Sequence, residues 1–176
     1  MTIVPDGKDW TWVLRQPCPE CGLDTSSFDR DEIPSLVLAN AAGWQAPLTA
    51  ADASVRPRPD KWSALEYGAH VRDVLRLYDY RLGLMLTQDN PLYPNWDQDE
   101  TAVAERYQSQ DPANVAAELT AAAQQVAASF AALNADQWER PGRRSDGASF
   151  TVETFGRYFV HDPLHHLYDV TGQRPR

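Results

Sequence analysis

Three of the four histidines of this chain lie in one short stretch near its C-terminal end. They are His161, His165 and His166, within the segment FVHDPLHHLYDV at residues 159–170. On a helix, residues four apart share a face and lie about 6 Å apart along the axis. His161 and His165 therefore converge, whereas His166 points about 100° away from His165. Two imidazoles at this spacing are typical of zinc sites built on a helix.

Two ligands are too few for a metal site, and the fourth histidine, His70, falls within a second predicted helix. Metal sites in helical bundles are built from side chains on facing helices. We therefore predict a site formed by His70, His161 and His165. Three neutral nitrogens would leave one coordination position open, as in a catalytic site. The competing interpretation is that each histidine is an ordinary core or surface residue.

Three further side chains near these ligands could support them. Asp73 lies one turn from His70, and Asp169 lies one turn after His165. Either carboxylate could orient an imidazole by accepting its second N–H, although such acids are more often simply solvated. We interpret His166 as a proton carrier or a surface residue.

Pro163 lies between the histidines and has two interpretations. Asp162 could cap a new helix with Pro163 at its first position, which would leave His161 outside that helix. Alternatively, a single helix continues through the proline, which lacks the N–H that would bond the carbonyl of Phe159. The helical spacing of Val152, Phe155 and Phe159 favours the continuous helix.

The chain also contains a C-x-x-C motif, Cys18 to Cys21, in the segment CPECG. It has the form of half of a structural zinc site, which needs four ligands, and there is no second such motif. Three interpretations remain open: a plain reduced turn, a redox-active pair, or a zinc site completed by another chain.

Four segments show helical patterns, and none alternates strongly enough to predict a strand. They run from about residue 31 to 42, from a capping box at Ser63 and Glu66 to about 87, from the N-cap Asp111 to about 133, and from about 149–151 to the residue before Gly172. We predict an all-α fold, an up-down four-helix bundle at residues 28–176, preceded by an extension with the C-x-x-C motif at 1–27.

The predicted connection at residues 88–110, between the second and third helices, is long for such a bundle. Long loops with their own aromatic residues are often functional. We predict that Trp96 and Asp97 in this connection bind a cofactor. The alternative is that the loop only packs Tyr93 and Trp96 onto the bundle.

The charge of the chain disfavours several partners. Its formal net charge is −9, with a pI of about 4.8, and no cluster of Lys and Arg offsets this. Such a surface repels nucleic acids and anionic lipids on average. No apolar run approaches the 18 or so residues of a membrane span, and the N-terminus lacks the pattern of a signal peptide. We expect a cytoplasmic protein that acts on a small molecule, and its alanine-rich helices are compatible with a homodimer.

Two motifs together resemble those of the DinB-like superfamily of four-helix-bundle metalloproteins, which includes relatives of the mycothiol-dependent maleylpyruvate isomerases. They are W-x-x-x-E-Y-x-x-H-V-R-D-V, from Trp62 to Val74, and R-Y-F-V-H-D-P-L-H-H-L-Y-D-V, from Arg157 to Val170. The resemblance covers roughly residues 28–172. It implies a divalent metal, zinc or nickel, held by His70, His161 and His165. The isomerase relatives have Glu at the position that we align with His161.

The resemblance also implies use of a low-molecular-weight thiol, mycothiol or bacillithiol. The leading hypothesis is therefore a metal-dependent thiol S-transferase acting on electrophilic small molecules, with catalytic residues that the sequence does not identify. The alternatives are a metal-dependent hydrolase with the same three histidines and a non-catalytic metal-binding module. Ligands alone do not distinguish these functions.

Overall fold

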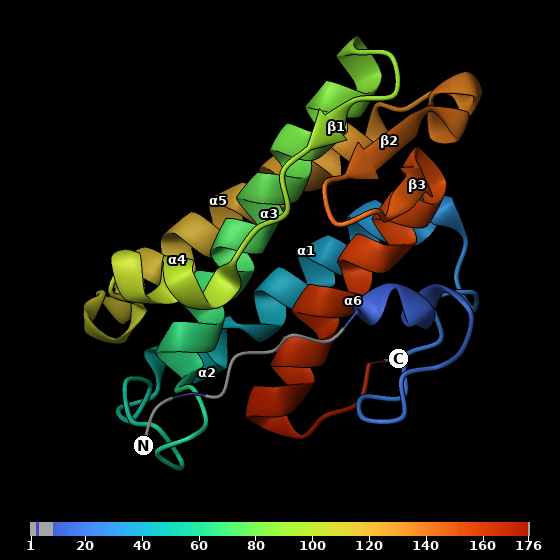
Figure 1. The fold of residues 1–176 in the computed structure, drawn as a ribbon. Coiled ribbons are helices and arrows are strands. Elements are labelled where there is room, and N and C mark those ends of the chain that lie inside the picture. Colours follow the sequence, from blue (N-terminus) through green and yellow to red (C-terminus); the bar gives the residue numbers. More distant parts are fainter. Residues whose placement is uncertain (1–2, 4–8, 176) are drawn as a thin grey trace.

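A computed structural model describes residue 3 and residues 9–175, and its framework is a bundle of four long helices (Figure 1). These are α1 (Ile33–Gly43), α3 (Ala64–Thr87), α5 (Pro112–Ala131) and α6 (Val152–Thr171). Each lies where the sequence predicts a helix. Short helices at α2 (Gln45–Thr49), Trp10–Leu14, Arg30–Glu32 and Ala135–Glu139 fill the connections.

The ends of these helices are fixed by local side chains. Ser63 and Glu66 form the predicted capping box of α3, in which each side chain bonds the backbone N–H of the other residue. Asp111 caps α5 by accepting a hydrogen bond from the N–H of Asn114. Gly172 ends α6 in the left-handed conformation, which glycine adopts without steric cost.

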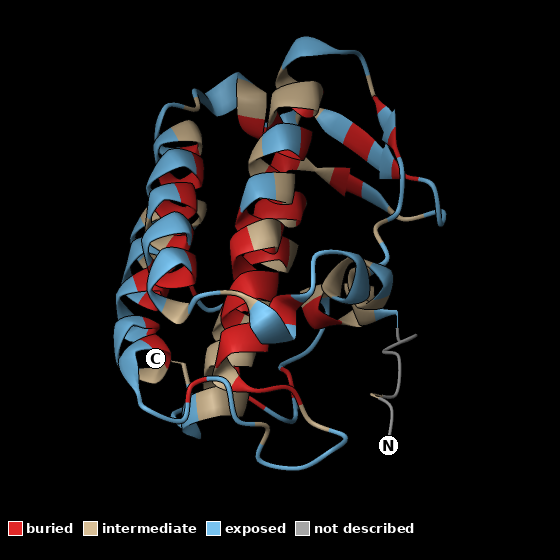
Figure 2. Cartoon of the chain, turned by 90° about the vertical axis from the view of Figure 1, so that its left-hand side faces the viewer, coloured by how far each residue is buried: buried red, intermediate tan, exposed pale blue. Residues whose placement is uncertain are grey.

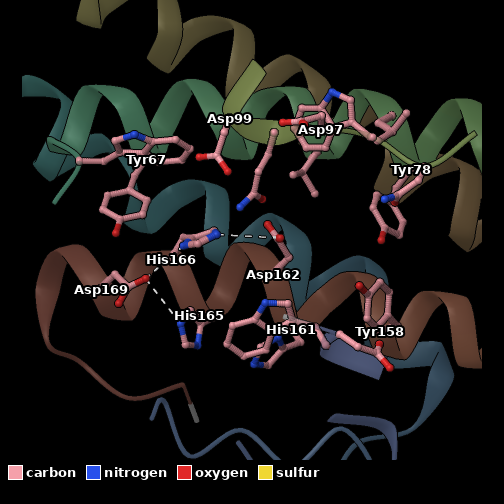
Figure 3. Close-up of a pocket in the computed structure, with 18 of the residues that line it drawn as sticks. Tyr67, Tyr78, Asp97, Asp99, Tyr158, His161, Asp162, His165, His166 and Asp169 are labelled. Carbon is pink, nitrogen blue, oxygen red and sulfur yellow. Dashed lines mark hydrogen bonds and ion pairs between the residues drawn. The ribbon is translucent and has the colours of Figure 1, made fainter. Parts of the chain in front are cut away.

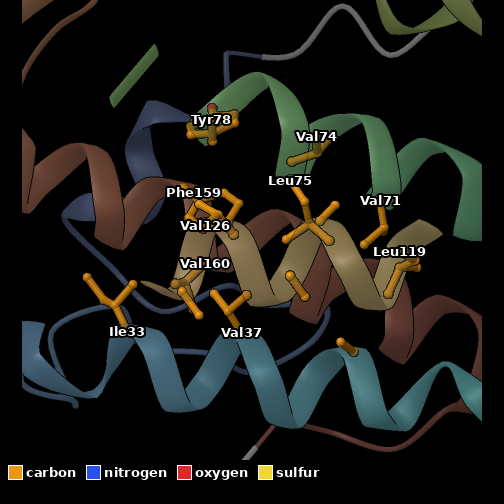
Figure 4. Close-up of a cluster of buried hydrophobic side chains, with 14 of the residues drawn as sticks. Ile33, Val37, Val71, Val74, Leu75, Tyr78, Leu119, Val126, Phe159 and Val160 are labelled. Carbon is orange, nitrogen blue, oxygen red and sulfur yellow. The ribbon is translucent and has the colours of Figure 1, made fainter. Parts of the chain in front are cut away.

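The core lies between the inward faces of the four helices, while their outer faces are exposed (Figures 2 and 4). Burying a Leu, Val or Phe side chain contributes about 1.5–3 kcal/mol, so this core supplies the main driving force for folding. The fully or nearly fully buried residues at its centre are Ile33, Val37, Val71, Val74, Leu75, Leu119, Val126, Phe159 and Val160.

The arrangement of the helices corrects the predicted up-down order. α1 packs on α5 and α6, and α3 packs on the same two helices, so that α1 and α3 are diagonally opposite. The colours of Figure 1 show that α3 and α5 start at the same end and run in the same direction, opposite to α1 and α6. A parallel pair requires the chain to return along the bundle between its two members, and residues 88–111 make this return.

The predicted absence of a sheet is wrong, because a small three-stranded sheet lies at one end of the bundle. Its strands are β1 (Leu92–Tyr93), β2 (Pro141–Arg144) and β3 (Ser149–Thr151), in the order β1-β2-β3. β1 pairs parallel to β2, which pairs antiparallel to β3. Strands of two to four residues are too short to show an alternating pattern. The return connection also contains a helix, α4 (Gln98–Ala104), and a 3-10 turn at Tyr107–Ser109.

The N-terminal extension packs on α6. Arg157 of α6 donates hydrogen bonds from Nη1 to the carbonyl oxygens of Thr25 and Phe28, both at 2.7 Å. The 3-10 helix Trp10–Leu14 contacts α6 as well. The described part of the extension therefore packs directly on the bundle. The division into separate units at 1–27 and 28–176 stays a prediction.

Within the described residues, no helix combines the length and apolar character needed to cross a membrane.

Glu66 gives a test of how the start of α3 is held. Its buried carboxylate pairs with Arg56 and accepts a hydrogen bond from the Ser63 N–H. Burial opposes ionisation, but these partners outweigh it and lower the pKa of Glu66. Its contribution to stability is therefore complete above the ordinary glutamate pKa of about 4.3 and is lost as the pH falls through the lowered value.

We expect Glu66→Gln to lower the free energy of unfolding by about 2 kcal/mol at pH 7, and the difference from wild type to shrink below pH 4. Urea unfolding across this pH range measures both. Asp60→Asn, at an exposed pair with Arg58, is the control and should change stability by less than about 1 kcal/mol. A pH-independent difference between Glu66→Gln and wild type would contradict the ion-pair explanation.

Candidate metal centres

Helix α6 presents two pairs of polar side chains, each with i, i+4 spacing, to two different sides. Figure 3 shows Asp162 and His166 pointing from α6 toward α3, while His161 and His165 point the opposite way, toward the N-terminal segment. Adjacent residues on a helix differ by about 100° in direction, so two pairs offset by one residue must diverge.

α6 runs without a break through Pro163, which confirms the continuous-helix interpretation and excludes Asp162 as a cap. Asn40 of α1 supports this point of the helix. Its side-chain amide donates to the carbonyl oxygen of Pro163 at 2.9 Å and accepts from the Trp44 indole N–H at 3.2 Å. The bond ties the polar segment of α6 to α1.

The first centre, which we name the triad, consists of His70, Asp162 and His166. One ligand atom from each lies within 4.8 Å of the others. His70 Nε2 is 3.4 Å from Asp162 Oδ1, and His166 Nε2 is 3.9 Å from Asp162 Oδ2. Two imidazoles and a carboxylate from two facing helices thus converge on one point.

His70 is fully buried, yet neither of its ring nitrogens has a hydrogen-bond partner among the described residues, and neither does Asp162 Oδ1. Buried polar atoms are nearly always satisfied. The His70 ring stacks on Trp96, with centroids 5.4 Å apart and an angle of 12° between the planes, and it also contacts Trp62. Aromatic walls therefore fix the ring, while Nε2 has only the 3.4 Å contact with Asp162, without hydrogen-bond geometry, which is the arrangement expected of a metal ligand.

Asp169 lies beside two of the histidines, where its carboxylate could orient them. Its Oδ2 lies 3.1 Å from His166 Nδ1 and 3.5 Å from His165 Nε2. A carboxylate on one ring nitrogen directs the other toward a metal. Asp73 does not have this role, because its carboxylate accepts from Arg72 Nε at 2.8 Å and from the Tyr107 hydroxyl at 2.6 Å.

The second centre, the tetrad, consists of Cys18, Cys21, His161 and His165. All four are buried, and one ligand atom from each lies within 4.8 Å of the others. Burial lowers the pKa of His161 to about 4, and it also lowers the pKa of His165. Both rings are therefore neutral at pH 7, which is the form that binds metals.

The carboxylate of the triad is held in its ligand form too. Burial opposes the ionisation of Asp162, but the adjacent His70 and His166 outweigh it and lower the pKa of the carboxyl group. Asp162 is consequently ionised at neutral pH.

The structure does not bring the three predicted ligands to one point. His70 lies with Asp162 and His166, whereas His161 and His165 lie with the two cysteines. The i, i+4 pair that faces His70 is the one shifted by a single residue, and it contains Asp162, which is considered from the sequence only as a helix cap. The spacing of four between Asp162 and His166 was the available signal. That any of these histidines binds a metal stays a prediction.

A cleft of about 600 Å³ adjoins the triad, and both polar and apolar side chains line it. Trp96 and Asp97, the predicted cofactor-binding residues, both line it, and Asp97 also caps α4 through the Glu100 N–H. Whether they bind a cofactor stays a prediction. Other lining residues come from α3, α6, β2 and the N-terminal extension, and they include Trp10, Glu20, Tyr67, Tyr78, Arg81, Arg144, Tyr158, His161, Asp162, His165 and His166.

Comparisons with known proteins agree with this fold. The sequence profile of the DinB superfamily matches residues 36–170. A solved structure, YfiT from Bacillus subtilis, superposes with a TM-score of 0.72 at 20% sequence identity, over 81% of this chain and 84% of that one. YfiT is described as a probable metal-dependent hydrolase with an unusual four-helix bundle topology. A search of curated protein sequences found no match.

Asn40 offers a test of how α6 is positioned. We expect Asn40→Ala to lower the free energy of unfolding by about 1–3 kcal/mol, because the buried Trp44 indole N–H loses its acceptor. Chemical denaturation measures the loss. Ser35→Ala is a control on the same helix, since its hydroxyl bonds only the local carbonyl of Glu32 at an exposed position. Equal effects of the two substitutions would contradict a role for Asn40 in holding α6.

Proposed function

This chain belongs to the DinB superfamily, and from that premise we propose that it is a metal-dependent hydrolase of small molecules with its metal held by the triad. The observation that carries the proposal is the fully buried ring of His70, whose nitrogens make no hydrogen bond among the described residues, placed against Asp162 and His166. The description of YfiT as a probable metal-dependent hydrolase supports the reaction class by analogy.

The donor set of the triad fits a divalent cation. Two imidazoles and one carboxylate are the protein ligands of several zinc hydrolases, which leave a position open for water or substrate. The same ligand set binds iron in oxygenases, so the ligands alone do not identify the metal. We propose zinc or nickel because the family resemblance implies one of these two ions. The side of the triad that adjoins the cleft provides access for a substrate.

When bound, a divalent cation would polarise a substrate carbonyl and lower the pKa of a coordinated water or thiol. The residues of the chain do the rest. Asp169 fixes the tautomer and direction of His166 through the contact at Nδ1. Trp96 and Trp62 hold the ring of His70 and exclude water from its faces.

Carboxylates outnumber basic groups along the walls of the cleft, but one cation, Arg81, is placed to pair with an anionic group of a substrate. Arg81 lines the cleft and is 3% exposed. Its guanidinium donates to the carbonyl oxygen of Pro94 at 2.7 Å and lies over the rings of Tyr78 and Tyr93. Among the described residues no carboxylate pairs with it, whereas the neighbouring Arg144 is paired with Asp146. A buried cation without a counter-ion is costly, and a substrate carboxylate or phosphate would compensate it.

The second candidate is the thiol transfer implied by the family resemblance, with mycothiol or bacillithiol as the cofactor. The volume of the cleft favours it, since about 600 Å³ is ample for a sizeable ligand. Trp96 and Asp97 are then the proposed contacts of that cofactor. Dependence of turnover on added thiol separates this reaction from hydrolysis.

The triad gives the main test of the proposed function. We expect His70→Ala and Asp162→Asn each to remove about one equivalent of bound metal. Each should also lower hydrolysis of activated esters and amides by more than the roughly 100-fold that loss of an orienting residue costs. Metal analysis of untagged protein and a substrate panel, with and without thiols, measure these effects.

Glu118→Gln is the matched control for Asp162→Asn, because this half-exposed carboxylate pairs with Arg72 outside the cleft. It should retain metal and activity. Unchanged metal content in His70→Ala would refute the metal assignment. Full metal content in the wild type without turnover in any assay would leave a non-catalytic metal-binding module.

Arg81 gives a separate test of substrate class. We expect Arg81→Gln to raise the KM for carboxylate-bearing esters by about 10–100-fold, because the substrate would lose a hydrogen bond to a charged group. The KM for matched neutral esters should change little, and Arg81→Lys should restore part of the difference. An equal effect on charged and neutral substrates would show that Arg81 only supports the fold.

A further inference from the structure

We propose that the tetrad is a second, closed metal site, in which Cys18, Cys21, His161 and His165 hold a structural zinc ion. The site differs from the triad in position, ligands and role. It joins the N-terminal extension to α6, whereas the triad joins α3 to α6. Four protein ligands leave no position for substrate, which is characteristic of structural zinc.

The distances of the tetrad fit tetrahedral coordination. Zinc bonds of about 2.3 Å to sulfur and about 2.0–2.1 Å to nitrogen imply ligand separations of roughly 3.3–3.8 Å around a tetrahedron. Cys18 Sγ and His165 Nδ1 lie 3.7 Å apart. All four ligand atoms lie within 4.8 Å of one another, so small adjustments of side chains would complete the set.

The loop that carries the cysteines has the form of a zinc-binding turn. The N–H of Gly22 bonds the carbonyl of Cys18 and the N–H of Cys18 bonds the carbonyl of Leu23, both at 2.8 Å. Gly22 follows the second cysteine with φ of +81°, a conformation that favours glycine. This turn directs both thiols to the same side, toward α6.

Each histidine of the tetrad has a feature expected of a metal ligand. His161 is 4% exposed, and its Nε2 has no hydrogen-bond partner among the described residues. His165 presents Nδ1 to Cys18, while its Nε2 lies 3.5 Å from both Glu20 and Asp169. Carboxylates behind a ligating imidazole are the usual outer contacts of a zinc site.

Charge balance favours a metal over the other interpretations of the C-x-x-C motif. A dication with two thiolates and two neutral imidazoles has no net charge, which suits a site where all four side chains are buried. Binding would release one proton from each thiol. A plain turn would leave His161 unsatisfied, and a redox-active pair would need the accessible, thiolate-stabilising surroundings that these buried cysteines lack. The two histidines also replace the second chain that a half-site would require.

The proposed zinc has a structural consequence for the cleft. Its ligands on α6 alternate with two triad residues, His161 before Asp162 and His165 before His166. The extension that it holds places Trp10 against both tetrad histidines, with ring centroids 5.4 and 5.3 Å apart, and Trp10 and Glu20 line the cleft. The zinc would therefore secure both one wall of the cleft and the rotation of α6.

The test is reconstitution of the full chain with Co²⁺, which reports thiolate ligands by a sulfur-to-metal charge-transfer band in the near ultraviolet. We expect wild-type protein to bind about two equivalents of metal and to show this band. Cys18→Ser and Cys21→Ser should bind about one equivalent and lose the band. His70→Ala should also bind about one equivalent but keep the band, which separates this proposal from the proposed function.

A second measurement does not depend on the folding of the variants. In zinc-loaded wild-type protein, both thiols should resist a thiol reagent, and removal of zinc by a chelator should make them react and expose the segment 9–28 to protease. Thiols that react equally with and without chelator, or a cobalt spectrum without the charge-transfer band, would overturn the proposal. A Cys18–Cys21 disulfide in the purified protein under reducing conditions would overturn it as well.

Discussion

The geometry of α6 governs both candidate centres. A helix advances about 100° per residue, so that two i, i+4 pairs shifted by one position must face different neighbours. His161 and His165 meet the N-terminal extension, while Asp162 and His166 meet α3. The unbroken helix through Pro163, supported by Asn40 at the proline carbonyl, keeps both pairs in phase. The concentration of histidine in one segment thus serves two sites with one rigid element.

Burial determines the chemistry available to each centre. His70 has lost all contact with solvent and has no hydrogen-bond partner at either nitrogen among the described residues, which is an unfavourable state unless a cation compensates it. Burial is also unfavourable for the tetrad, because two thiols and two neutral imidazoles are buried together. The difference lies in the number of protein ligands, because three in the triad leave a coordination position for substrate, whereas four in the tetrad leave none, although residues of both centres line the cleft.

Much of the framework could be predicted from the sequence because its signals are local. The capping box at Ser63, the Asp111–Pro112 start and Gly172 all act within one turn of the chain, and each marks a helix end in the structure. The order of the helices depends on contacts between distant segments, so no local pattern revealed the parallel pair α3 and α5. The grouping of the polar side chains differs from the prediction for a related reason. Spacing identifies which side chains share a face, but it does not say which neighbour that face meets, and in the structure His70 lies with Asp162 and His166 rather than with His161 and His165.

The parallel direction of α3 and α5 has a consequence for how such a protein can diversify. Because the chain travels back along the bundle, it lays a long span beside α3, and residues 95–99 of this span line the cleft while Trp96 stacks on His70. The sequences of the four helices can then stay constant while only the sequence of this connection changes. Selectivity for a new substrate could evolve there without disturbing the residues of the triad.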